Sequence, residues 1–162
     1  MNTQSTTSSG TRWKFVKNLL KRQQRVSIII DGPNILRKVG NKQVRLEDIE
    51  EAVSELGSIN EKFTILNPNA SQKLVQAISN SGYNPIIVST GDLHLKLGLT
   101  VLEVAERNRN DILVIGSRDA RCTPILVKLK EKGFKTAIIG FEPGFSISLK
   151  NNADFVLELF GN

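Results

Sequence analysis

The chain has 162 residues, with 22 basic side chains, 16 acidic side chains and a single cysteine. This length supports one domain with a sizeable core and is short for two. One cysteine excludes an internal disulfide framework and is typical of a reducing compartment. No stretch approaches the roughly 18 uninterrupted apolar residues of a membrane span, and the first residues lack the apolar region of a signal peptide, so we expect a cytoplasmic protein with no membrane partner.

Residues 1–10 read MNTQSTTSSG, and we expect a disordered tail there because these small polar side chains have nothing to bury. Residues 11–25 predict a basic amphipathic helix, since apolar residues recur at helical spacing with lysines and arginines between them. We expect the apolar stripe of this helix, which includes Trp13, to dock onto the body of the protein and to leave the basic face exposed.

The positive charge of the chain is concentrated in this N-terminal arm. Residues 1–25 contain six basic side chains and no acidic one, so they account for the whole net charge of +6. A polyanion is the natural partner of such an arm, with nucleic acid preferred over a membrane surface. The predicted RNA-binding residues are Arg12, Lys14, Lys17, Lys21, Arg22 and Arg25.

The chain from Val26 onward alternates short apolar runs with amphipathic segments. Continuous apolar strands followed by such helices are typical of a parallel sheet that is covered on both faces. We therefore predict one α/β domain over residues 26–162, a three-layer αβα sandwich with a central, mainly parallel sheet of five to six strands. The predicted strands are 26–30, 62–67, 84–90, 111–117, 135–140 and 154–159, and the predicted helices are 46–57, 70–82, 93–108, 123–133 and 145–153.

Polar side chains follow several of these strands where each strand ends. Asp31 closes the first strand, Asn34 lies in the next turn, and Asp119 follows the fourth strand. Ligands of parallel sheets bind beyond the carboxyl ends of the strands, so we expect these side chains to lie together. Two neighbouring carboxylates favour a cation with oxygen ligands, such as Mg²⁺ or Mn²⁺, but aspartates also cap turns and helices. Both interpretations stay open at this point, and Asp92 is predicted to cap the helix at 93–108, with a metal-ligand role as its alternative.

Three separated stretches of the chain closely resemble the archaeal branch of the NYN domains, within the PIN-like nuclease superfamily. The resemblance implies a metal-dependent ribonuclease fold with an acidic site at the strand ends. It also implies that Asp31 and Asp119 hold Mg²⁺ or Mn²⁺ and that Asn34 orients the site, which makes these three the catalytic residues if the protein is active. The stretches are IIIDGPNILRK, GSRDA and EPGFSISLKNNADFV, and the resemblance runs from about Val26 to Leu159.

The chain departs from the family pattern at several site positions. His94 stands where the family usually has an acidic ligand, and Arg121 replaces a second acid. Cys122 replaces the aromatic neighbour of that acid, and Thr100 stands where a further acid often falls. Of the family's acids, only those at Asp31 and Asp119 remain on matching positions.

These substitutions predict a site that has lost catalysis. An arginine is always charged and can form two parallel hydrogen bonds with a carboxylate. Arg121 can therefore occupy the place of the metal and pair with Asp31 or Asp119, and its charge opposes the entry of a cation. We accordingly expect no cofactor, with Mg²⁺ or Mn²⁺ needed only if the site is active.

Three functions follow, in order of preference. The first is an RNA-binding protein on an inactive nuclease fold, acting within a ribonucleoprotein. The second is an active Mg²⁺- or Mn²⁺-dependent endoribonuclease with a reduced site, helped by Asp92 or Glu103. The third is a protein-interaction adaptor or a subunit that partners an active family member, and either a homodimer or a heterodimer is compatible with the sequence. The geometry around Arg121 separates the first two functions, because an arginine that bridges both aspartates favours the inactive site.

Overall fold

The computed structural model describes residues 12–16 and 23–161. Its centre is a six-stranded sheet in the order β3-β2-β1-β4-β5-β6, and every neighbouring pair of these strands is parallel. The predicted α/β sandwich is thus confirmed, with the upper of the two expected strand numbers. The strands are β1 (Arg25–Asp31), β2 (Ser58–Leu66), β3 (Asn84–Ile87), β4 (Ile112–Gly116), β5 (Thr136–Gly140) and β6 (Phe155–Glu158).

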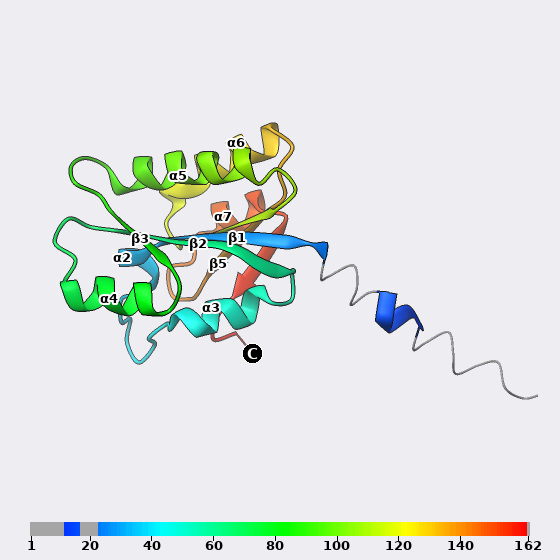
Figure 1. Ribbon diagram of the computed structural model, residues 1–162. Coiled ribbons are helices and arrows are strands. Elements are labelled where there is room, and N and C mark those ends of the chain that lie inside the picture. The colour runs from blue at the N-terminus through cyan, green and yellow to red at the C-terminus, as the bar shows by residue number, and fades with distance from the viewer. Residues whose placement is uncertain (1–11, 17–22, 162) are drawn as a thin grey trace, which may run out of the picture.

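Helices cover both faces of the sheet (Figure 1). One face is packed against α2 (Gly32–Ile35), α3 (Leu46–Val53) and α4 (Gln72–Asn80). The opposite face is packed against α5 (Leu93–Arg107), α6 (Thr123–Glu131) and α7 (Ile147–Asn152), with a short 3-10 helix η1 (Ala120–Cys122) leading into α6. Among the described helices, none is long and apolar enough to cross a membrane.

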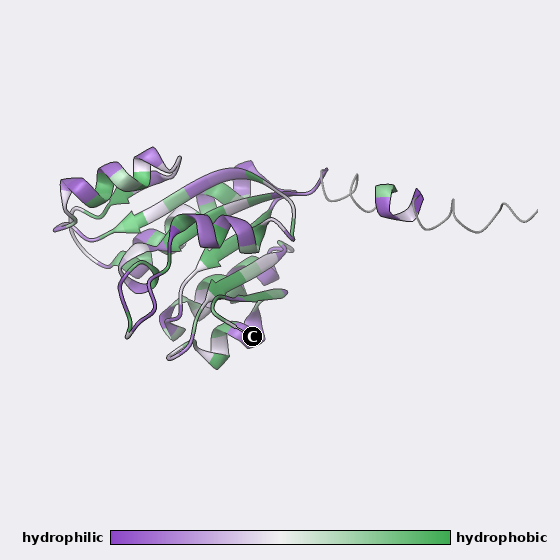
Figure 2. Cartoon of the chain, turned by 90° about the horizontal axis from the view of Figure 1, so that it is seen from below, coloured by the Kyte–Doolittle hydropathy of each residue, from purple (hydrophilic) through white to green (hydrophobic). Residues whose placement is uncertain are grey.

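The isoleucine run of β1 supplies side chains to both halves of the core. Ile28 and Ile30 belong to the cluster beneath α3 and α4, whereas Ile29 belongs to the cluster beneath α5 and α6. Side chains alternate between the faces of a strand, so a central strand covered on both sides must be apolar throughout. Figure 2 shows this contrast, with largely hydrophobic strands against helices of mixed character.

Two predicted boundaries are corrected by the packing between strands. β2 begins at Ser58, four residues before the predicted start, because it pairs with β1 from Arg25 onward. α3 ends at Val53 and not at Gly57. A Cβ atom at Gly57 would collide with the backbone carbonyl of Gln24, so this glycine permits the close approach of two chain segments and does not cap the helix.

The N-terminal arm is described only in part. Residues 12–16 are helical, and the side chains of Trp13 and Phe15 are largely exposed. Part of the apolar stripe lies outside the described residues, so its docking onto the body stays a prediction. Arg25 was predicted to end the arm, but it is the first residue of β1 and pairs with Asp111 at 3.3 Å. The predicted tail and the basic residues Lys17, Lys21 and Arg22 lie outside the described residues.

Candidate functional site

The candidate site lies where the strand order changes direction. β1 and β4 are neighbours at the centre of the sheet, while the connections that leave them run toward opposite edges. Such a switch point leaves a crevice beyond the carboxyl ends of the two strands. Asp31 ends β1 and Asp119 follows β4, so the topology brings both predicted carboxylates to this crevice.

The turn after β1 is shaped by the sequence Asp31-Gly32-Pro33-Asn34. Asp31 caps α2, since its Oδ1 accepts a hydrogen bond from the backbone N–H of Asn34 at 3.3 Å. Pro33 occupies the first turn of α2, where its missing N–H costs nothing. Gly32 lies so close to β2 that a Cβ atom would come within 2.7 Å of the Ile65 carbonyl oxygen. The turn therefore fixes the carboxylate and requires glycine behind it.

Replacing Gly32 with alanine is expected to lower the free energy of unfolding by about 2 kcal/mol, because the new Cβ would clash with the backbone of β2, which is held in the sheet. Gly98→Ala in α5 is a matched control, since its new Cβ would make only ordinary contact with Ile125, at 3.4 Å from Cγ1. That change should raise stability by about 0.5–1 kcal/mol through helix propensity. Urea denaturation measures both, and equal effects of the two changes would contradict the role given to Gly32.

Asn34 ties the end of β1 to the end of β4. Its Oδ1 accepts a hydrogen bond from the backbone N–H of Arg118 at 2.7 Å, and its own carbonyl accepts one from Arg118 Nη2 at 3.3 Å. The guanidinium also donates to the Pro143 carbonyl at 2.6 Å and lies 4.3 Å from the ring centroid of Phe141. Asn34 thus holds the ends of β1 and β4 together. The buried Arg118 was not foreseen as a partner, because no sequence pattern separates a buried arginine from an exposed one.

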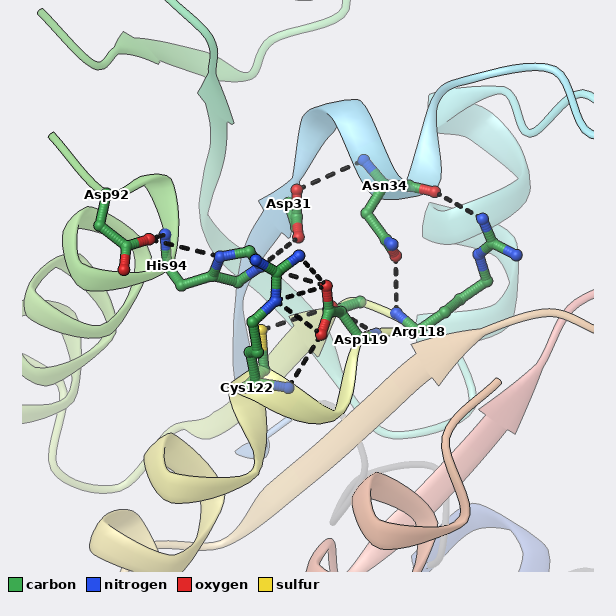
Figure 3. A network of polar contacts seen from close by, with 9 residues as sticks. Asp31, Asn34, Asp92, His94, Arg118, Asp119 and Cys122 are labelled. Carbon is green, nitrogen blue, oxygen red and sulfur yellow. Dashed lines mark hydrogen bonds and ion pairs between the residues drawn. The ribbon is translucent and has the colours of Figure 1, made fainter. Parts of the chain in front are cut away.

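His94 lies between the two carboxylates (Figure 3). Its Nε2 is 3.5 Å from Asp31 Oδ2 and 3.6 Å from Asp119 Oδ2. Asp92 caps α5 as predicted, by accepting the backbone N–H of His94 at 2.8 Å, and its Oδ1 also lies 3.4 Å from the ring's Nδ1. All three aspartates therefore cap a helix or turn and also face this imidazole, so capping and site formation are compatible.

Among the described residues, Arg121 forms its ion pair with Asp119 and with no other carboxylate. Its Nη2 lies 2.6 Å from Oδ2, its Nε donates to both carboxylate oxygens, and its backbone N–H caps the turn through Oδ1 at 2.9 Å. The arginine lies two residues beyond the aspartate in η1, so its side chain folds back locally instead of reaching Asp31. Of the two partners that the sequence allowed, Asp119 is the one observed, and the bridging position belongs to His94.

The two carboxyl groups differ in their acidity. The hydrogen bonds from Arg121 lower the pKa of Asp119 to about 2. Burial raises the pKa of Asp31, while the nearby His94 ring and the Asn34 N–H act in the opposite direction. Asp119 is thus already compensated by a permanent cation, whereas Asp31 is a buried acid that depends on its neighbours for compensation.

Other predicted residues lie outside the pocket. Thr100 donates to the Lys96 carbonyl of its own helix at 2.8 Å and is buried, so it does not take the place of the missing acid. Glu103 lines a separate hollow farther along α5, which removes it as a helper of the carboxylates. Cys122 is fully buried behind the site, with its thiol 3.4 Å from Ser117 Oγ, and burial raises its pKa to about 11.

The pocket in front of these groups has a volume of about 210 Å³ and mixed charge. Arg37 and Asn67 also contribute to its wall, and the sequence analysis did not single out either of them, although Arg37 lies within the stretch IIIDGPNILRK and Asn67 ends a predicted strand. The pocket presents carboxylates beside guanidinium groups, an arrangement that can hold a phosphate on the cationic side. Its full lining is Asp31, Pro33, Asn34, Arg37, Asn67, Leu93, His94, Asp119 and Arg121.

This donor set does not fit the Mg²⁺ or Mn²⁺ that the resemblance implies. Mg²⁺ requires a nearly octahedral shell of oxygen atoms, usually one or two free carboxylates with water and phosphate. Here Asp119 is bound on both oxygens by Arg121, and a nitrogen atom of His94 lies between the carboxylates. The residues present therefore favour compensation by protein side chains over a hard metal ion.

Comparisons with known proteins agree with the fold. The family model of the NYN domain matches residues 25–159. An uncharacterised protein of Methanocaldococcus jannaschii is 40% identical over 139 residues, which cover 86% of this chain and 57% of that protein. A protein of unknown function from Vibrio parahaemolyticus has a solved structure with a TM-score of 0.71 and 14% identity, covering 84% of this chain and 93% of that one. At this identity, the structural likeness concerns the fold alone.

Proposed function

Because the chain belongs to the NYN domain family, we propose that it is an RNA-binding protein whose nuclease-type site does not cleave RNA. The observation that carries this proposal is the position of His94, with Nε2 3.5 Å from Asp31 and 3.6 Å from Asp119. In a metal-dependent nuclease, a cation between the carboxylates neutralises charge at the scissile phosphate and activates water. Here a protein side chain occupies the space between the same two groups.

The charges around the pocket support RNA binding. Arg37 and Arg121 are exposed on its wall, and guanidinium groups bind phosphate through paired hydrogen bonds. The N-terminal arm adds six further basic residues, including the exposed Arg12 and Lys14. A chain of this kind holds the RNA backbone without cutting it. We extend the proposal to a role within a ribonucleoprotein in the cytoplasm.

The competing function is an endoribonuclease that uses Mg²⁺ or Mn²⁺. One observation favours this function, namely that Asp31, Asn34 and Asp119 line the same pocket. The side chain of Arg121 is also 73% exposed and holds Asp119 from the solvent side. This function requires Arg121 to leave Asp119 before a metal binds. The metal must therefore compete with a permanently charged guanidinium for the same carboxylate.

Purified protein is expected to bind single-stranded RNA and to leave it intact with either Mg²⁺ or Mn²⁺. Gel analysis of end-labelled RNA measures cleavage, and fluorescence anisotropy measures binding in the same buffer. The matched control is Asp31→Asn, which keeps the shape of the side chain and removes its charge. Metal-dependent cleavage that disappears in Asp31→Asn would establish the nuclease instead, whereas cleavage that persists in this variant identifies a contaminating enzyme.

A further inference from the structure

The only histidine and the only cysteine of the chain lie side by side at the site. One carboxylate oxygen of Asp31, Nε2 of His94 and Sγ of Cys122 all lie within 4.8 Å of one another. The three residues come from β1, α5 and η1, so the fold and not the local sequence brings them together. A carboxylate, an imidazole and a thiol are the ligand types of zinc sites in proteins.

We propose that Asp31, His94 and Cys122 form a binding site for a divalent transition metal, with Zn²⁺ as the preferred ion. Zinc bonds of about 2.0–2.3 Å place tetrahedral ligands roughly 3.3–3.8 Å apart. The separation of 3.5 Å between Nε2 and the Asp31 oxygen already satisfies this requirement. The thiol lies within 4.8 Å of both atoms and must move closer to join them, and water can supply the fourth ligand.

The histidine is oriented as a ligand. Asp92 lies 3.4 Å from Nδ1, so the Nδ1 proton faces a carboxylate and the lone pair of a neutral ring lies on Nε2. Nε2 is buried and has no hydrogen-bond partner among the described residues, although two carboxylates lie near it. A carboxylate behind a metal-binding histidine is a regular feature of zinc sites, because it fixes both the tautomer and the ring orientation.

The charges at the site also balance with Zn²⁺. The Asp31 carboxylate and the Cys122 thiolate together neutralise the ion, and the thiol proton is released to solvent when the sulfur–zinc bond forms. Arg121 does not oppose this ion, because its charge is already matched by Asp119. The preference follows from the donors, since nitrogen and thiolate ligands select Zn²⁺ over Mg²⁺.

Metal binding is tested on the full chain, prepared without a polyhistidine tag, by competition with a chromophoric zinc chelator. We expect one Zn²⁺ per chain and no competition by Mg²⁺. Co²⁺ should give a thiolate-to-metal charge-transfer band, which reports Cys122 unambiguously because no other cysteine exists. Cys122→Ser should abolish that band and lower Zn²⁺ affinity more than 100-fold, and His94→Gln should lower affinity by a similar factor. Asp92→Asn, which still caps α5, should cost about tenfold.

The control is Glu103→Gln, an exposed change on the same helix that should leave the affinity unaltered. Circular dichroism verifies that each variant is folded. If Cys122→Ser does not fold, the Zn²⁺ affinity of His94→Gln tests the proposal. Zn²⁺ affinity unchanged in His94→Gln, or a Co²⁺ complex without the charge-transfer band, would overturn the proposal. Because these measurements contain no RNA, a negative result for Zn²⁺ binding does not contradict the proposed RNA binding. A negative result for RNA binding likewise does not contradict the zinc site.

Discussion

Removal of residues 1–22 is expected to abolish most of the nonspecific affinity for single-stranded RNA. The deleted segment carries five of the six basic residues of the arm, whereas Arg25 remains because it belongs to β1. Each phosphate contact contributes roughly 0.7 to the salt slope on single strands, so the slope should fall by about 3.5. Between 50 and 200 mM salt, the affinity of the full chain should therefore fall about 100-fold more than the affinity of the truncated protein. Fluorescence anisotropy over a salt series measures the slope.

The boundary of this truncation is set by packing. Gln24 must stay, since its carbonyl accepts the Ser58 N–H at 3.0 Å and its amide binds the Asn110 carbonyl at 2.9 Å. A second variant, Trp13→Ala with Phe15→Ala in the full chain, separates base stacking from charge, because it should weaken binding without changing the salt slope. If the truncated protein binds RNA with unchanged affinity and salt slope, the arm does not bind RNA and the binding is assigned to the arginines of the pocket.

The double change His94→Asp and Arg121→Asp is expected to create a site for Mg²⁺. Four carboxylates would then face the pocket with Arg37 left as a cation on its wall, and their repulsion should lower the stability of the metal-free protein by on the order of 3 kcal/mol. Mg²⁺ at about 100 times its dissociation constant should restore about 2.7 kcal/mol, since it binds only the folded state. Urea denaturation with and without Mg²⁺ gives both quantities.

The matched control is the pair His94→Asn and Arg121→Asn, which has the same side-chain shapes without the added charge. It should show little response to Mg²⁺, so the difference between the pairs isolates electrostatics from packing. The aspartate pair should also lose the affinity for Zn²⁺, because the imidazole ligand is gone. If Mg²⁺ stabilises the unmodified protein as strongly as the aspartate pair, His94 and Arg121 do not exclude the metal and the nuclease function gains.

The pattern of apolar and polar residues was sufficient to predict most of the fold. Continuous runs such as Ile28–Ile30 are compatible with a strand buried on both faces, and all six predicted strands occur. The cap at Asp92 could be predicted for a similar reason, since an aspartate before a helix satisfies free N–H groups locally. The meeting of Asp31 and Asp119 followed from the rule that ligands bind beyond the carboxyl ends of parallel strands. These features depend on residues that are close in the sequence and on the order of strands and helices along the chain, and both can be taken from the sequence itself.

The pairing of charges at the site was decided by tertiary structure. The sequence placed Arg121 near both aspartates, but the tight turn of η1 directs its guanidinium to Asp119 and not to Asp31. His94 reaches the space between the carboxylates because α5 starts above the ends of β1 and β4, and the same packing brings it to Cys122. Which side chains meet between separate elements depends on ångström-scale placement of helices over the sheet. Periodicity along the chain determines which face of an element is buried, but it does not determine which atoms that face contacts.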